Sequence, residues 1–110
     1  MPEVPRPYSF AFVRTDLPVA DQVVQVGHVC MEAGARWPGV ERENLVVFGV
    51  DKGQLEYAMD RLAWLGIEWV EFHEPDEARP GEGPMGLTAI CTRPSPGQPK
   101  ALRLLKLWNV

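Results

Sequence analysis

The sequence predicts a single α/β domain, a three-layer α/β/α sandwich on a four-stranded mixed sheet. Short apolar runs rich in β-branched and aromatic residues alternate with longer segments of helical periodicity, which is typical of βα units with parallel strands. The last two runs are separated only by a loop rich in Pro and Gly, so the final strand is expected to return antiparallel. With a short helix at the end, the predicted order is β-α-β-α-β-β-α.

The first predicted unit joins a buried strand to a helix. Tyr8–Arg14 contains four consecutive apolar residues, which favours a strand covered on both faces. Asp21 lies near the start of the following helix, where a carboxylate suits the positive end of the helix dipole. The helix should end at about Arg36, because Pro38 disfavours helical backbone at Trp37. Its apolar and small residues are expected to be buried, namely Val23, Val24, Val26, Val29, Cys30, Met31 and Ala33.

The second predicted unit begins with Asn44–Val50, a β-branched-rich run that indicates another buried strand. Asp51 follows as a helix N-cap, and Gln54 three residues later completes a capping box. The helix ends at Gly66, which favours a left-handed C-cap. Its buried face is expected to consist of Leu55, Ala58, Met59, Leu62 and Leu65.

The rest of the chain predicts a wide hairpin followed by a short helix. Ile67–His73 and Met85–Thr92 are the two strands, and Glu74–Pro84 is a long acidic loop between them. Pro94–Pro99 is a turn region. Lys100–Trp108 is then expected to be a helix that packs through its leucines.

Length and composition indicate a globular protein. The 110 residues suffice for one hydrophobic core, so one domain spanning 1–110 is expected. No apolar run approaches the roughly 20 residues that a membrane span needs, and Met1–Pro7 does not resemble a signal peptide. Cys30 and Cys91 are expected to be buried thiols, with a disulfide as the alternative. These features predict a cytoplasmic protein without a membrane segment.

The charges are distributed unevenly along the chain. All 15 acidic side chains lie in the first 82 residues, and the last 28 residues carry four basic side chains and no acidic ones. The acidic balance argues against broad, sequence-independent coating of nucleic acid. The basic C-terminal stretch is compatible either with a few phosphate contacts or with a purely solvated surface.

A polar stripe on the first helix marks the candidate site. Asp21, Gln25, His28, Glu32 and Arg36 follow one another at steps of four, three, four and four residues, so they share one helical face. In an α/β sheet, ligands bind beyond the carboxyl ends of the parallel strands, and the start of this helix lies at that edge. We expect the stripe to meet the end of the third strand there. The alternative is a solvated face with an ordinary His–Glu pair.

The same edge should carry the residues that follow each parallel strand. These are Arg14, Thr15 and Asp16 after the first, Asp51 after the second, and His73, Glu74, Pro75 and Asp76 after the third.

The pattern Val13-Arg14-Thr15-Asp16-Leu17, followed by a helix with Gln25-x-x-His28, resembles the archaeal and eukaryotic (second-type) peptidyl-tRNA hydrolase family. The likeness continues through Val46–Val50, the helix ending at Gly66 and Leu87–Ile90, and covers nearly the whole domain. The resemblance implies hydrolysis of the ester between peptide and tRNA without a metal or organic cofactor. It implies tRNA or an acyl-tRNA end as partner.

The chain departs from the family pattern at several positions. Asp21 stands where the family has a Lys, seven residues before the motif His, and the turn before the helix is two residues shorter. Glu74–Ala78 replaces an Asp-Ala-Gly-Arg-Thr-like run, and Gly86 is the nearest match to a later hydroxyl residue. The resemblance is therefore to a divergent branch, and losing one charge-stabilising donor typically costs about 10²–10³ in rate.

The predicted function is weak hydrolysis of peptidyl-tRNA, and the alternative is a catalytically inactive binding module of the same fold. His28, Gln25, Glu74 and Asp21 are the candidate catalytic residues. The candidate substrate-binding residues are Arg14, Asp16 and Asp76, with Arg93, Lys100 and Arg103 for phosphates.

Three other possibilities carry less weight. His28, Cys30, His73 and Cys91 lack the spacing of a zinc site, so no metal ligands are predicted. Acidic residues of the Glu74–Pro84 loop could hold a divalent cation, although such loops are usually only solvated. Four tryptophans exceed the need of a small core, which makes a homodimer a further possibility.

Overall fold

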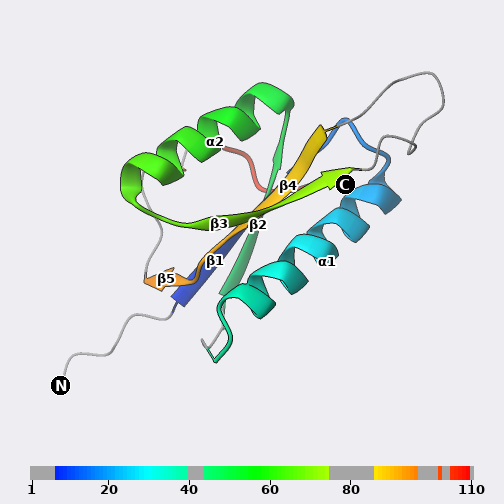
Figure 1. Ribbon diagram of the computed structural model, residues 1–110. Helices are drawn as coiled ribbons and strands as arrows, with labels where there is room; N and C mark the ends of the chain where they lie inside the picture. Colours follow the sequence, from blue (N-terminus) through cyan, green and yellow to red (C-terminus); the bar gives the residue numbers. More distant parts are fainter. Residues whose placement is uncertain (1–6, 40–43, 75–85, 97–101, 103–104, 110) are drawn as a thin grey trace.

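The computed structural model describes residues 7–39, 44–74, 86–96, 102 and 105–109. These residues form a mixed α/β structure, with two helices and a mixed sheet of five strands (Figure 1). The elements are β1 (Pro7–Arg14), α1 (Val19–Arg36), β2 (Asn44–Val50), α2 (Lys52–Leu65), β3 (Trp69–Glu74), β4 (Gly86–Thr92) and β5 (Ser95–Pro96).

The strand directions are those that the sequence predicts. The strands lie in the order β2-β1-β4-β3, and the two-residue β5, absent from the prediction, pairs with the start of β1. β1 and β2 are parallel, in a register from Tyr8 opposite Asn44 to Arg14 opposite Val50. Because β4 is antiparallel to both β1 and β3, the first three strands run the same way and their carboxyl ends meet at one edge.

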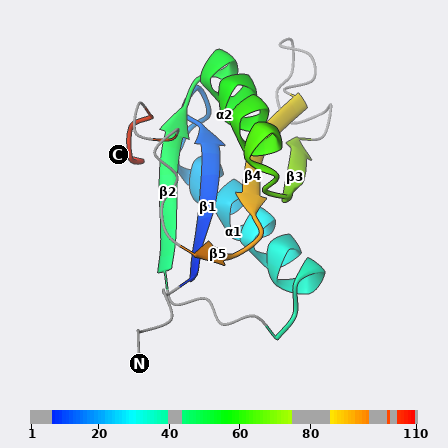
Figure 2. The ribbon, with the colours of Figure 1, turned by 90° about the vertical axis from the view of Figure 1, so that its left-hand side faces the viewer.

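The two helices pack against opposite faces of the sheet (Figures 1 and 2). Phe10 and Phe12 of β1 belong to the core cluster on the α2 side, and Ala11 and Val13 belong to the cluster on the α1 side. Successive side chains of a strand point to opposite faces, so β1 is buried on both. This burial on both faces explains why the four consecutive residues Phe10–Val13 are all apolar.

The local signals around α2 are confirmed. The Asp51 carboxylate accepts a hydrogen bond from the Gln54 backbone N–H at 2.7 Å, and the Gln54 side chain accepts one from the Asp51 N–H at 2.9 Å. Both bonds satisfy donors that an uncapped helix would leave open. Gly66 ends the helix with φ 73°, a left-handed conformation that L side chains rarely adopt.

The predicted burial of α1 is wrong for three residues. Val23, Val24 and Met31 are 55%, 53% and 75% exposed. Val29 and Ala33 are buried as predicted, and the other two buried positions are Gln22 and Gln25. This set follows the helical period, so one narrow face that includes two glutamines packs on the sheet, whereas Val23 and Val24 lie on the exposed side of the helix.

The C-terminal segment also differs from the prediction. Among the described residues of the expected helix Lys100–Trp108, Leu105–Trp108 are not helical, and Leu107 forms an antiparallel bridge with Phe48 of β2. The Gly49 N–H donates to the Lys106 carbonyl at 3.1 Å, and the Trp108 N–H donates to the Val47 carbonyl at 2.8 Å. The outer edge of β2 offers unpaired backbone groups, and this pairing satisfies them better than a short isolated helix would.

Trp108 anchors this segment to the body of the domain. Its ring packs against the core cluster on the α1 side, and its Nε1–H donates to the Gln22 Oε1 at 2.7 Å. Trp37 packs against the same cluster and Trp69 against the other, whereas Trp64 is 78% exposed. Three of the four tryptophans thus have an intramolecular role, and the homodimer remains a prediction.

Neither described helix is both long enough and apolar enough to cross a membrane.

Replacing Trp108 with Ala should lower the free energy of unfolding by about 2–3 kcal/mol, because it empties a partly buried site and leaves the Gln22 amide without its donor. Chemical denaturation measures this change. The matched variant Trp64→Ala, at an exposed position, should change stability by less than about 0.5 kcal/mol. Equal effects of the two variants would contradict the docked position of the C-terminal segment.

Candidate functional site

The polar stripe of α1 meets the end of β3, as the sequence predicts. Gln25 is only 4% exposed, and its Nε2 donates to the Glu74 Oε2. The Thr88 hydroxyl of β4 approaches the Gln25 Oε1 at 3.4 Å. One buried amide therefore connects α1 with the carboxyl end of β3 and with the start of β4.

A β-bulge brings Thr88 into this group. Phe72 is paired with Ala89 and His73 with Leu87, so Thr88 is the extra residue on β4. Ala89 packs into the cluster on the α1 side and Leu87 against the cluster on the α2 side. Without the bulge, neighbouring residues of β4 would point to opposite faces. Because of the bulge, the buried Thr88 side chain points toward α1, as that of Ala89 does.

Thr88 is a site residue that the sequence did not predict. Gly86, which is the nearest match to the later hydroxyl residue of the family pattern, has φ 71° and begins β4. A glycine inside a strand pattern often marks a bulge, and that signal could have pointed to Thr88.

His28 lies beside the same strand. Its ring stacks on Phe72, with 4.8 Å between ring centroids and 9° between the ring planes. His28 is exposed, and Phe72 is two residues from Glu74 on β3. The stack fixes the imidazole next to the Gln25–Glu74 contact while the ring remains accessible to a ligand.

Two further carboxylates flank this group on α1. Asp21 lies in the first turn, four residues before Gln25, and Glu32 lies four residues after His28; both are exposed. Residues four apart on a helix are neighbours on its surface. Glu74, His28, Gln25, Thr88 and Asp21 therefore form the candidate site.

Arg14 and Asp16 lie apart from that group. The Arg14 Nε and Nη2 donate to the two Asp16 carboxylate oxygens at 3.0 and 2.5 Å, and Nη1 donates to the Leu87 carbonyl at 3.3 Å. Arg14 follows Phe12 by two residues, so it points to the α2 side of the sheet, where it lines a hollow of about 250 Å³ with Lys52. The structure therefore does not bring Arg14 into contact with the α1 stripe.

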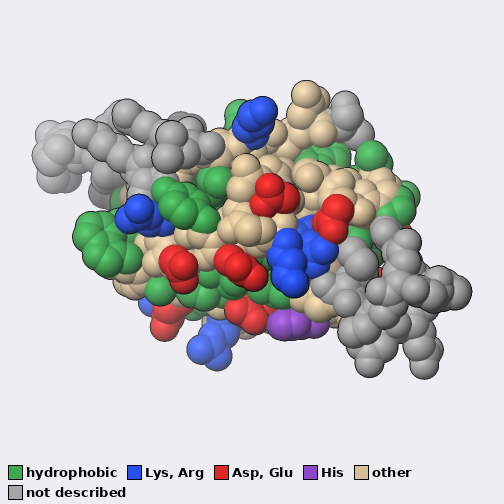
Figure 3. Space-filling model, turned by 90° about the horizontal axis from the view of Figure 1, so that it is seen from above, with side chains coloured by type: hydrophobic (Ala, Val, Ile, Leu, Met, Phe, Trp, Pro, Cys, Tyr) green, Lys and Arg blue, Asp and Glu red, His purple; other side chains and the backbone are tan. Residues whose placement is uncertain are grey.

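The predicted phosphate contacts are only partly described. Arg93 lies just beyond β4 at the opposite end of the sheet, 3.5 Å from the Glu68 carboxylate. Asp76, Lys100 and Arg103 lie outside the described residues. The face that carries α2 shows acidic and basic side chains interspersed rather than one basic surface (Figure 3).

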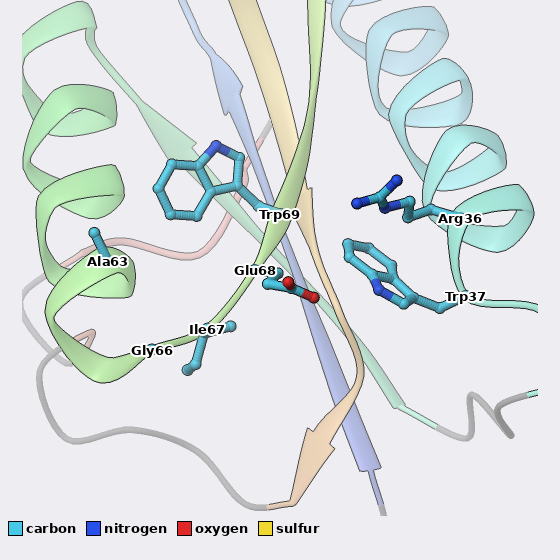
Figure 4. Close-up of a pocket in the computed structure, with 7 residues that line it drawn as sticks. All are labelled: Arg36, Trp37, Ala63, Gly66, Ile67, Glu68 and Trp69. Atoms are coloured by element: carbon cyan, nitrogen blue, oxygen red, sulfur yellow. The ribbon is translucent and has the colours of Figure 1, made fainter.

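A larger hollow of about 400 Å³ lies at that opposite end, where β3 begins (Figure 4). Arg36 and Trp37 line it from the end of α1, and Trp69 lies across the strand on the side of α2. Glu68 is the only carboxylate among its described lining residues. This hollow lacks the combination of imidazole, amide and carboxylate found at the other edge.

In the part of the chain that the structure describes, no three His, Cys, Asp or Glu side chains converge as a metal ion would require. His28 lies on the α1 side of the sheet, where its ring stacks on Phe72. His73 is the next residue of β3, so it points to the opposite face, and there it contacts Glu71 at 3.1 Å.

No protein-family model matches this chain, and no curated protein matches it either. The site is therefore defined by its own geometry: a carboxylate held by a buried amide, with an accessible imidazole beside it. Imidazole and carboxylate side chains are common proton-transfer groups in general acid–base catalysis.

Thr88→Val should lower the free energy of unfolding by about 1 kcal/mol, because the isosteric change removes the hydroxyl that faces the buried Gln25 carbonyl oxygen. Thermal or urea denaturation checks this. Thr88→Ser keeps the hydroxyl and is the matched control, since it should retain this contact while losing only a methyl group. A Val variant as stable as the parent would show that the Thr88–Gln25 contact is not formed.

Proposed function

We propose that this protein hydrolyses an acyl ester of tRNA, in the manner of a second-type peptidyl-tRNA hydrolase. The observation that carries the proposal is the Gln25–Glu74 contact beside His28 at the carboxyl edge of the sheet. The sequence resemblance supports it, as does the arrangement of helices on both faces of the sheet, which suits the three-layer sandwich expected for that family. The activity belongs in the cytoplasm, where acylated tRNA is used.

Glu74 is the group suited to activate water. Gln25 donates to one carboxylate oxygen, which orients the group and leaves its remaining lone pairs for a water molecule. The water oxygen bonds to the ester carbonyl carbon while Glu74 takes a proton from it. The bond from that carbon to the ribose oxygen then breaks.

His28 is suited to complete the reaction at the leaving group. Its ring is accessible and held on Phe72, so a protonated imidazole can donate to the departing ribose oxygen. The products are a free carboxylic acid and a ribose hydroxyl. Glu74 gains one proton and His28 loses one, so the total number of protons on the protein is unchanged. Transfer of a proton from Glu74 to His28 through solvent then restores both groups for the next turnover.

The alternative function is a non-catalytic module that binds the same ligand. The observation in its favour is Asp21, a carboxylate in the first turn of α1 where the hydrolase pattern has a positive charge. A negative charge there opposes an oxyanion developing on the ester, so binding without turnover is the consistent alternative.

Glu74→Gln and His28→Ala should each lower kcat/KM for peptidyl-tRNA by about 10²-fold or more, because each removes a proton-transfer group. Glu71→Gln and His73→Ala are matched controls, since both residues are exposed on the other side of β3. Release of the peptide from labelled peptidyl-tRNA measures the rates. Equal rates in all five proteins would leave the binding module as the better account.

A further inference from the structure

The side of α1 that faces away from the sheet is apolar and exposed to water. It carries four large side chains that are 47%, 55%, 53% and 75% exposed, namely Val19, Val23, Val24 and Met31. These are half of the eight large hydrophobic side chains that are exposed in the described part of the chain. In Figure 1, no described helix or strand lies beyond α1 on the side away from the sheet.

No charged side chain of α1 lies among these four residues. Successive residues are about 100° apart around a helix, so the four share one half of its circumference with Ala20 and Gly27. The polar stripe lies in the other half. We call the first half the outer face, and it consists of Val19, Ala20, Val23, Val24, Gly27 and Met31. Because it holds no charged or hydrogen-bonding side chain, burying it in an interface carries little desolvation cost.

The outer face is large enough to form half of a small dimer interface. Its four large side chains expose on the order of 400 Å², an area in the range of the largest apolar patches of monomers, which are often functional. With the small residues and the rim included, two copies would bury about 1,000 Å² in total, the lower limit for a specific protein interface.

The outer face is also complementary to itself when two helices run antiparallel. Gly27 lies at its centre, four residues from both Val23 and Met31. If two copies of α1 cross at Gly27, each Val23 lies against Met31 of the other copy. Gly27 is exposed, and a Cβ added there would meet nothing within 4 Å. A glycine at the crossing point lets the helix axes approach to about 8 Å, the close end of the usual range.

We propose that this protein forms a homodimer through the outer face, with the two α1 helices packed antiparallel. A membrane surface suits the face less well, because helices that lie on membranes are rich in Lys and Arg, whereas this chain has a net charge of −4. Dimerisation explains why Val23, Val24 and Met31 are apolar although one chain leaves them exposed. The inference does not depend on the proposed hydrolase function.

The first test measures the dimer dissociation constant by analytical ultracentrifugation over a wide concentration range. Val23→Glu and Met31→Glu should each raise it at least about tenfold, because each places a carboxylate without a partner in the apolar interface. Both positions are exposed in the single chain, so folding should be unaffected. Trp64→Glu is the matched control, since Trp64 is 78% exposed on α2, on the other side of the sheet, and it should leave the constant unchanged.

The second test uses cysteines to read the direction of the helices, in a Cys30→Ser background. Gly27→Cys should form a disulfide between two copies under mild oxidation, because the antiparallel crossing brings the two Cα atoms within the roughly 4–7 Å that a disulfide spans. Val19→Cys is the control. It lies eight residues from Gly27, so its two copies would be about 24 Å apart along the helices and should not join.

A parent protein that stays monomeric at its highest soluble concentration would overturn the inference. So would a dimer that Trp64→Glu dissociates and Met31→Glu does not, because its interface would then lie on α2. Joining through Val19→Cys rather than Gly27→Cys would rule out the antiparallel crossing. None of these results bears on hydrolysis of peptidyl-tRNA, which is measured separately.

Discussion

The buried amide of Gln25 is the contact on which this arrangement depends. A polar group removed from water is stable only when it is hydrogen-bonded, and Gln25 finds Glu74 on β3 and Thr88 on β4. Because these partners lie on two strands, the helix can satisfy them in only one rotation and at one height on the sheet. The position of His28 follows, since it is one turn further along α1 and there it meets Phe72.

Gln22 imposes a second constraint of the same kind near the start of α1. Its Nε2 donates to the Leu17 carbonyl at 2.6 Å, and its Oε1 accepts the Trp108 indole. The turn before the helix and the C-terminal segment are therefore tied to one side chain. Two buried glutamines on one face leave Val23, Val24 and Met31 on the outside, although burial of those residues alone would be favourable.

The two edge strands of the sheet, β2 and β3, are protected from pairing with another chain in different ways. The outer edge of β2 is covered by Lys106–Trp108, which satisfies its backbone groups. β3 ends the strand order on the other side, and it carries exposed Glu71 and His73 together with a bulge in its pairing with β4, features that discourage pairing with another chain. The same bulge turns Thr88 toward Gln25. One irregularity in the β3–β4 pairing therefore both protects the edge strand and helps to form the candidate site.

Local chemistry was sufficient for much of the fold. The four apolar runs, the Asp51–Gln54 capping box and Gly66 each act within a few residues, and the βα alternation fixes which strands run parallel. The spacing of Gln25 and His28 likewise placed both on the stripe that meets β3. The sequence alone therefore determined the two helices, the four longer strands, the strand directions and one side of the candidate site.

Tertiary structure decided what depends on partners distant in the chain. Gln22 and Gln25 are buried because of contacts 86 and 49 residues away, with Trp108 and Glu74, which no helical period reveals. Thr88 enters the site through a register shift between two strands, and Lys106–Trp108 became an edge pairing because β2 offered free backbone groups. Arg14 is not part of the candidate site, because side chains of a strand alternate between its two faces and Arg14 lies on the face opposite α1.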